Sequence, residues 1–123
     1  MPEQRLRALR GAITVGHNDT DSIIAGTSEL LEEMLGRNEV DSQDLVSMIF
    51  TTTGDLTAEF PAAAARKLGI SAVPLLCARE IDVPGAVPRC IRVLMHVYTK
   101  RDHDGLEHVY LGDAKQLRTD LQE

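Results

Sequence analysis

The chain has no tryptophan and only two tyrosines and two phenylalanines among its 123 residues. Its core must therefore be built mainly from aliphatic side chains. The hydrophobic fraction of 43% is ordinary for a globular protein. A chain of this length buries roughly two-thirds of its unfolded surface, so it needs no disulfide or metal to fold. We expect a single domain over residues 1–123.

Long apolar runs are also missing. No stretch approaches the ~18 apolar residues of a membrane-spanning helix. The first residues, MPEQRLRALRG, contain no apolar segment typical of a signal peptide. Two cysteines, Cys77 and Cys90, indicate free thiols in a reducing compartment. We therefore expect a cytoplasmic protein without membrane contact.

Basic residues are outnumbered, with 13 lysines and arginines against 19 acidic residues and a net charge of −6. A nucleic-acid-binding protein needs a basic surface, so this balance argues against such a partner. Any anionic ligand would have to be held by a local group of arginines against the overall field.

Motifs for metals, nucleotides and nucleophilic catalysis are absent as well. The four histidines are scattered, and the spacing of Cys77 and Cys90 matches no zinc pattern. There is neither a Walker loop nor a G-x-G-x-x-G motif. No histidine is indicated near Cys77 to act as its base, so Cys77 is interpreted as a packing residue or a pocket wall. We predict no metal site and no cofactor.

Hydrophobic periodicity predicts the element order β-α-β-α-β-β-β. An apolar stripe with Asp19 or Thr20 as a cap and Gly36 at the end predicts a helix over residues 20–36. Pro61, a run of alanines and Gly69 predict a second, shorter helix. Alternating or short apolar runs predict strands over residues 5–15, 45–53, 70–78, 89–99 and 107–111, with a polar C-terminal tail over 112–123.

These elements indicate an α+β fold, a mixed sheet packed by two main helices. Several strand runs are apolar on both faces, and two helices cannot cover them all. We expect the uncovered sheet surface to form an oligomer. The face of strand 89–99 that carries Arg92 is expected to be covered, because Cys90 and Leu94 share it.

The stretch CAREIDVPGAVPRCIR, residues 77–92, carries the most chemistry. Turn residues between Asp82 and Pro88 are expected to place Glu80 and Arg92 near the same end of two neighbouring strands. Such a pair is either a structural ion pair or part of a ligand site. Further arginines and a tyrosine near strand ends suit a small carboxylate ligand, because guanidinium groups bind carboxylates through paired hydrogen bonds: Arg10, Tyr110 and Arg118.

Phe60 precedes the second helix and is either a packing staple or the rim of a pocket. Its position alone favours the staple.

Several segments, taken in order, resemble the monofunctional chorismate mutases of the trimeric class with a pseudo-α/β barrel. They are RGAITV at 10–15, GDLTAEFPAAAAR at 54–66, VPLLCAREIDVPG at 73–85, CIRVLM at 90–95 and HVYL at 108–111, followed by Leu117 and Arg118. The resemblance implies a homotrimer with sites between subunits. It also implies the Claisen rearrangement of chorismate to prephenate, on the route to phenylalanine and tyrosine. That reaction proceeds without a cofactor, a metal or a covalent intermediate.

The resemblance also implies residue roles. Arg92 matches the donor to the ether oxygen, and Glu80 the carboxylate that receives the ring hydroxyl. Arg10 and Tyr110 match ligands of the substrate carboxylates. The remaining matches are pocket walls (Phe60, Leu76 and Cys77) and residues at the mouth (Arg66, Leu117 and Arg118).

Two other functions remain open at this stage. One is an imine/enamine deaminase-like trimer, which also binds small carboxylates through arginine but is not expected to pair Glu80 with Arg92. The other is a non-catalytic trimer that binds a small carboxylate. Turnover of chorismate separates both from a mutase.

Overall fold

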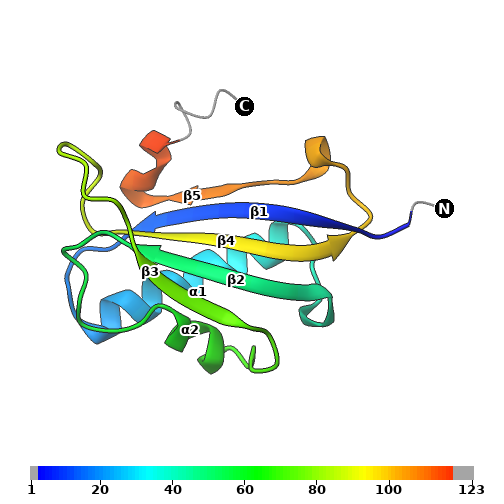
Figure 1. The fold of residues 1–123 in the computed structure, drawn as a ribbon, viewed down its shortest axis with the longest axis horizontal. Helices are drawn as coiled ribbons and strands as arrows, with labels where there is room; N and C mark the ends of the chain where they lie inside the picture. Colours follow the sequence, from blue (N-terminus) through cyan, green and yellow to red (C-terminus); the bar gives the residue numbers. More distant parts are fainter. Residues whose placement is uncertain (1–2, 118–123) are drawn as a thin grey trace.

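Five strands form one mixed sheet in the order β3-β2-β4-β1-β5 in this computed structural model, which describes residues 3–117 (Figure 1). The central strand β4 runs antiparallel to both β1 and β2, while β3 is parallel to β2 and β5 is parallel to β1. The predicted α+β fold with a mixed sheet is thereby confirmed. The strands are β1 Arg5–Thr14, β2 Leu45–Thr52, β3 Leu75–Arg79, β4 Cys90–Thr99 and β5 Val109–Leu111.

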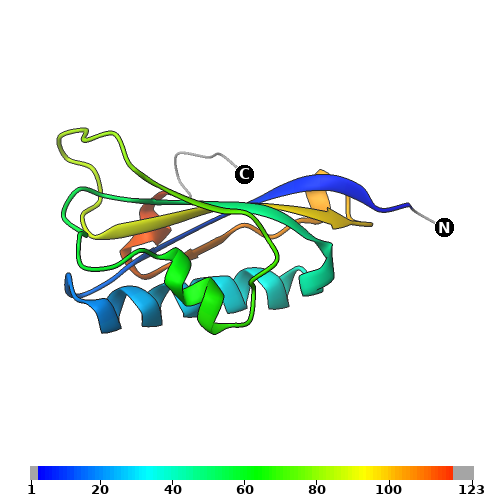
Figure 2. The same cartoon turned by 60° about the horizontal axis from the view of Figure 1, so that its bottom comes forward.

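Both helices, α1 (Thr20–Arg37) and α2 (Ala62–Lys67), lie on the same face of the sheet (Figure 2). Asp19, one of the two predicted caps, caps the start of α1, because its carboxylate accepts a hydrogen bond from Ser22 N at 2.7 Å. This bond also holds the pKa of Asp19 below its ordinary value. Gly69, just after α2, has a φ of 88°, as expected of a glycine that ends a helix.

The core lies between the helices and the sheet. Its largest fully buried apolar side chains are aliphatic or sulfur-containing with a single phenylalanine: Phe50, Leu9, Ile23, Leu30, Leu31, Met34, Met48, Ile91, Met95, Val97 and Val109. Residues of β4 that face this side alternate with those that face away, as the pattern of strand 89–99 predicted. Among residues 3–117, no helix combines the length and hydrophobicity needed to cross a membrane.

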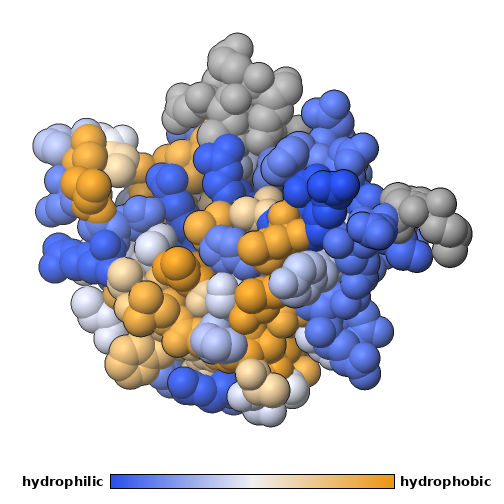
Figure 3. All heavy atoms as spheres, turned by 45° about the vertical axis from the view of Figure 1, so that its right-hand side comes forward, coloured by the Kyte–Doolittle hydropathy of each residue, from blue (hydrophilic) through white to orange (hydrophobic). Residues whose placement is uncertain are grey.

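Neither α1 nor α2 covers the opposite face of the sheet (Figures 1 and 2). Large apolar side chains are exposed there, including Leu6, Leu76 and Tyr98. Figure 3 views this face obliquely and shows apolar residues gathered over its middle. The sequence predicts that the face of β4 that carries Arg92 is covered. In a single copy of the chain this prediction is wrong for most of that face, and Arg92 itself is exposed. We call this surface the open face.

The described part of the predicted polar tail has regular structure, because residues Gly112–Leu117 form a 3-10 helix, η3. Gly112 turns the chain with a φ of 61°, and a Cβ there would lie 2.7 Å from Thr14 Oγ1. The same Thr14 oxygen accepts a hydrogen bond from Asp113 N at 2.9 Å. Ala114 is then fully buried on the open face, where η3 covers the start of β4 at Cys90.

The third strand is shorter than predicted, since it begins at Leu75 rather than at residue 70. Pro74 has no N–H to donate to a ladder, which keeps the preceding residues out of the sheet. Only the carbonyl of Pro74 takes part, accepting from Met48 N at 3.1 Å.

Candidate active site

A row of residues crosses all five strands on the open face. In the strand register Thr51 of β2 lies opposite both Ala78 of β3 and Arg92 of β4. Ala12 of β1 lies opposite both Arg92 and Tyr110 of β5. Residues that lie directly opposite each other on neighbouring strands share one face of a sheet, so these five side chains all lie on the open face. The small side chain of Ala12 leaves room between the guanidinium and the phenol.

A hollow of about 340 Å³ opens over this row. We call it the first hollow. Five of the predicted site residues line it: Arg10, Glu80, Arg92, Tyr110 and Leu117. Its remaining lining is mainly apolar or small, from Gly11, Ala12, Ile49, Thr51, Val93 and Leu94. Two arginines, one carboxylate and one phenol in an apolar hollow are the groups that a small dicarboxylate with a hydroxyl would need.

The ion pair in the first hollow joins Arg92 Nε to Glu80 Oε1 at 3.3 Å. The Arg92 side chain is 47% exposed and that of Glu80 is 23% exposed, so both can reach a ligand. Glu80 follows β3 directly, and its N–H donates to Thr52 O at 2.9 Å, which extends the ladder with β2. The two residues meet as predicted, but their strands are not neighbours, because β2 lies between them.

Residues that the sequence interpretation missed hold the base of the loop between Glu80 and Arg92. The Asp55 carboxylate accepts from Arg89 N at 2.9 Å and from Thr53 Oγ1 at 2.6 Å. Thr53 Oγ1 in turn accepts from Cys90 N at 2.9 Å, and Arg89 Nε donates to Val15 O at 3.0 Å. Arg89 has a φ of 49°, in the left-handed region. The only sequence signal for this clamp is the run of threonines before Gly54-Asp55 at a strand end.

Burial raises the pKa of the Cys90 thiol, and the nearby charge of Arg92 opposes this only in part. A buried thiol whose pKa lies above its usual range stays protonated and is a poor nucleophile. Cys90 therefore acts as packing beneath η3, beside Ala12, Tyr110 and Ala114.

A second hollow, of about 460 Å³, lies between β3 and the segment that leads into α2. Phe60 and Cys77 line it, together with neighbours that include Thr52, Thr57, Glu59 and Arg79. Phe60 is 68% exposed, so the staple interpretation is wrong and the pocket-rim interpretation fits. No residue between positions 3 and 117 lines both hollows.

Comparison with known proteins identifies the family. Residues 6–121 match the family model described as chorismate mutase type I. The chain belongs to the type I chorismate mutases. Its activity is accordingly that of a chorismate mutase, an isomerase, as the resemblance implied. This assignment favours the mutase over the deaminase-like alternative.

Relatives of this chorismate mutase agree in length and fold. It is 49% identical over 118 residues to the chorismate mutase AroH of Thermus thermophilus, an alignment that covers 95% of this chain and 97% of that one. It is 42% identical over 117 residues to the chorismate mutase AroH of Bacillus subtilis, covering 94% and 92% of the two chains. A solved chorismate mutase from Clostridium thermocellum superposes with a TM-score of 0.88 at 50% identity, covering 89% of this chain and 98% of the other.

Two predicted site residues that the structure describes, Leu76 and Arg66, lie outside both hollows of this chorismate mutase. Leu76 points from the open face, opposite Ile49, and is 61% exposed. Arg66 is exposed on α2. Arg118 lies outside the described residues. A single copy thus brings together the predicted polar groups and Leu117, but not all of the predicted walls and mouth.

Proposed function

We propose that the chain converts chorismate to prephenate in the first hollow, and that the second hollow of a neighbouring copy completes the site in a homotrimer. The observation that carries this proposal is the gathering of Arg10, Glu80, Arg92 and Tyr110 around one apolar hollow. Chorismate is a dicarboxylate, and this acidic protein offers it two arginines at one place.

The reaction breaks one C–O bond and forms one C–C bond within the same molecule, so no proton needs to be transferred. The protein has two tasks: to hold the substrate in its compact reactive shape and to stabilise the charge that separates as the ether bond lengthens. Arg10 and Tyr110 would hold carboxylates. Arg92 would donate to the ether oxygen as it becomes negative. Glu80 would accept from the ring hydroxyl and face the ring as it becomes positive.

The distribution of the predicted site residues over two hollows supports the proposed homotrimer. Two of the three predicted walls, Phe60 and Cys77, line a hollow separate from the one that holds the polar groups, which supports a site completed by a neighbouring copy. The exposed apolar side chains of the open face supply a surface that a second copy would cover. Leu76 and Arg66 would then reach the site of a neighbouring copy, and Leu117 and Arg118 would lie at its mouth. We place this activity in the cytoplasm.

Chorismate consumption by the purified protein, with prephenate identified as the product and no metal or cofactor added, tests the proposal. We expect Arg92→Lys to lower kcat/KM by roughly 10²–10³-fold, the usual effect of removing a donor to a developing oxyanion. An ammonium group cannot reproduce the position and paired donors of the guanidinium.

Arg37→Lys is the matched control, because Arg37 lies at the end of α1 in an exposed pair with Glu33, away from both hollows. It should retain wild-type turnover. A wild-type rate in Arg92→Lys would remove Arg92 from the reaction. A folded oligomer that binds chorismate without converting it would favour the non-catalytic alternative.

A further inference from the structure

The Glu80 carboxylate is held through only one of its oxygens. Thr51 Oγ1 donates to Oε1 at 3.0 Å, and Arg92 Nε lies 3.3 Å from the same atom. No hydrogen bond from residues 3–117 reaches Oε2. The hydrogen bond from Thr51 and the ion pair with Arg92 meet at one oxygen and leave the other oxygen for a ligand. This arrangement suits a residue that has to accept a hydrogen bond from a substrate hydroxyl.

Arg92 alone is a poor anchor for Glu80. Nearly half of the Arg92 side chain is exposed, and exposed ion pairs do little to fix a side chain in one position. The proposed reaction also requires the same guanidinium to turn toward the ether oxygen. The position of Glu80 therefore needs a second donor that does not itself contact the reacting bond.

Thr51 meets this requirement because of its place in the sheet. It lies on β2, an inner strand paired on one side with β3 and on the other with β4. Its two direct neighbours across the strands are Ala78, two residues before Glu80, and Arg92. Threonine is β-branched and restricted at χ1, so its hydroxyl has a defined direction. The hydroxyl sits on the rigid part of the site, whereas Glu80 begins a loop.

We propose that Thr51 is a positioning residue for the reaction, acting through Glu80. Its hydroxyl holds Oε1 so that Oε2 is directed to the ring hydroxyl of the substrate. This inference rests on the proposed function, in which Glu80 receives that hydroxyl. Thr51 does not itself touch the breaking bond.

The test is a double-mutant cycle measured as kcat/KM for chorismate, with Thr51→Val, Glu80→Ala and the combined variant. Valine keeps the shape and strand preference of threonine but removes the donor. We expect Thr51→Val to lower kcat/KM by about tenfold or more, as for the loss of a hydrogen bond to a charged group. Thr51→Ser should retain activity within about threefold, because the hydroxyl remains. In the Glu80→Ala background the Thr51→Val change should cost nothing further, because residues that act as a unit are not additive.

Ser47→Ala is the matched control, since Ser47 lies on the same strand and face but contacts His96 Nδ1 at 3.1 Å. It should keep wild-type turnover in an intact oligomer. Thr51→Ala takes the place of Thr51→Val if the valine variant fails to assemble. The inference would be overturned by wild-type activity in Thr51→Val, or by an equal loss from this change in the wild-type and Glu80→Ala backgrounds. It would also be overturned if Thr51→Ser were as inactive as Thr51→Val. Wild-type turnover in Glu80→Ala would instead overturn the role proposed for Glu80.

Discussion

Asp55 shows how much a single side chain near the surface can organise. Its carboxylate joins the end of β2 to Arg89, the residue just before β4. Burial raises the pKa of Asp55, but the bonds from Thr53 and Arg89 N, with the charge of Arg89, outweigh it and leave the pKa below its ordinary value. Folding therefore favours the charged form of this carboxyl.

The consequence for acid stability has a definite sign. A carboxyl whose folded pKa is depressed stabilises the fold above its unfolded pKa, about 3.9, and loses this contribution as pH falls through the folded pKa. We expect the unfolding free energy of the wild type to fall more steeply below about pH 4 than that of Asp55→Asn, because the variant lacks this proton uptake. Thermal unfolding between acid and neutral pH measures the difference.

Asp102→Asn is the control, because the Asp102 side chain accepts no hydrogen bond within residues 3–117. Parallel pH curves for the wild type and Asp55→Asn would show that Asp55 is not charged preferentially in the folded state.

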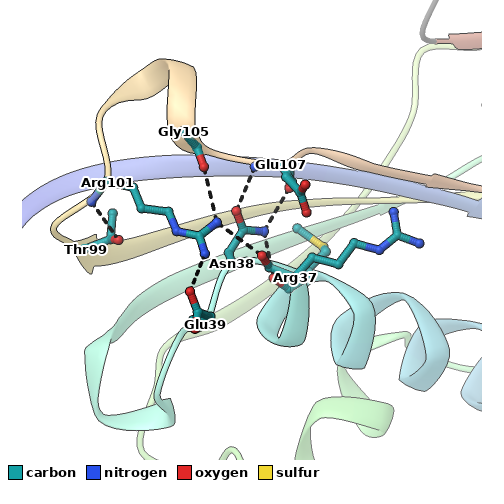
Figure 4. A network of polar contacts seen from close by, with 8 residues as sticks. Arg37, Asn38, Glu39, Thr99, Arg101, Gly105 and Glu107 are labelled. Atoms are coloured by element: carbon teal, nitrogen blue, oxygen red, sulfur yellow. Dashed lines mark hydrogen bonds and ion pairs between the residues drawn. The ribbon is translucent and has the colours of Figure 1, made fainter.

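At the scale of elements, the end of α1 is fastened to the segment that leads into β5 (Figure 4). The buried Asn38 side chain donates to Met34 O and to Glu107 O, both at 2.8 Å, and accepts from Glu107 N at 2.7 Å. Arg101 bonds to Arg37 O, Gly105 O and Glu39 around the same corner. The junction thus joins the C-terminal end of α1 to the segment that leads into β5.

Asn38→Ala should lower the free energy of unfolding by about 2–3 kcal/mol, because it removes three hydrogen bonds of a buried side chain, one to Met34 O and two to the part-buried backbone groups of Glu107. Chemical denaturation measures this loss. Glu33→Ala, which breaks only the exposed pair with Arg37 near the same helix end, should change stability by less than about 0.5 kcal/mol. Equal losses in the two variants would contradict a special role for Asn38.

Elements were predictable where a strong local pattern determines them, as in α1 and β4. Strand order was not, because alternation shows which residues share a face but not which strand lies beside which. The intervening β2 between Glu80 and Arg92, and with it the role of Thr51, was therefore missed. The η3 helix was missed because its packing depends on one alanine and on a bond to Thr14. Phe60 was misread because Ala65, four residues into α2, is too small to form a staple.

At the scale of the whole molecule, a site shared between copies can be tested by mixing variants. Arg92→Ala damages only the first hollow, and Phe60→Asp damages only the second by placing a carboxylate beside an anionic substrate. Each protein alone should have little activity. Random reassembly of an equal mixture should restore about a quarter of the wild-type activity, since in a ring each interface pairs one partner's first hollow with the next partner's second.

Activity should appear only after the copies have exchanged, which brief partial denaturation and refolding would allow. A mixture that stays inactive after exchange, while the wild type treated in the same way recovers, would place the whole site within one copy. Size-exclusion chromatography with light scattering provides the oligomer mass for each sample.

The row of residues across the five strands also bears on how such proteins can change in length during evolution. An insertion or deletion of one residue within β4 ahead of Arg92 would turn its guanidinium into the core and bring an apolar neighbour to the surface. The exposed turn at residues 102–104, at the far end of the sheet, carries no part of the row and can lengthen or shorten without moving it. Natural length variation should therefore gather at that turn and spare the strands.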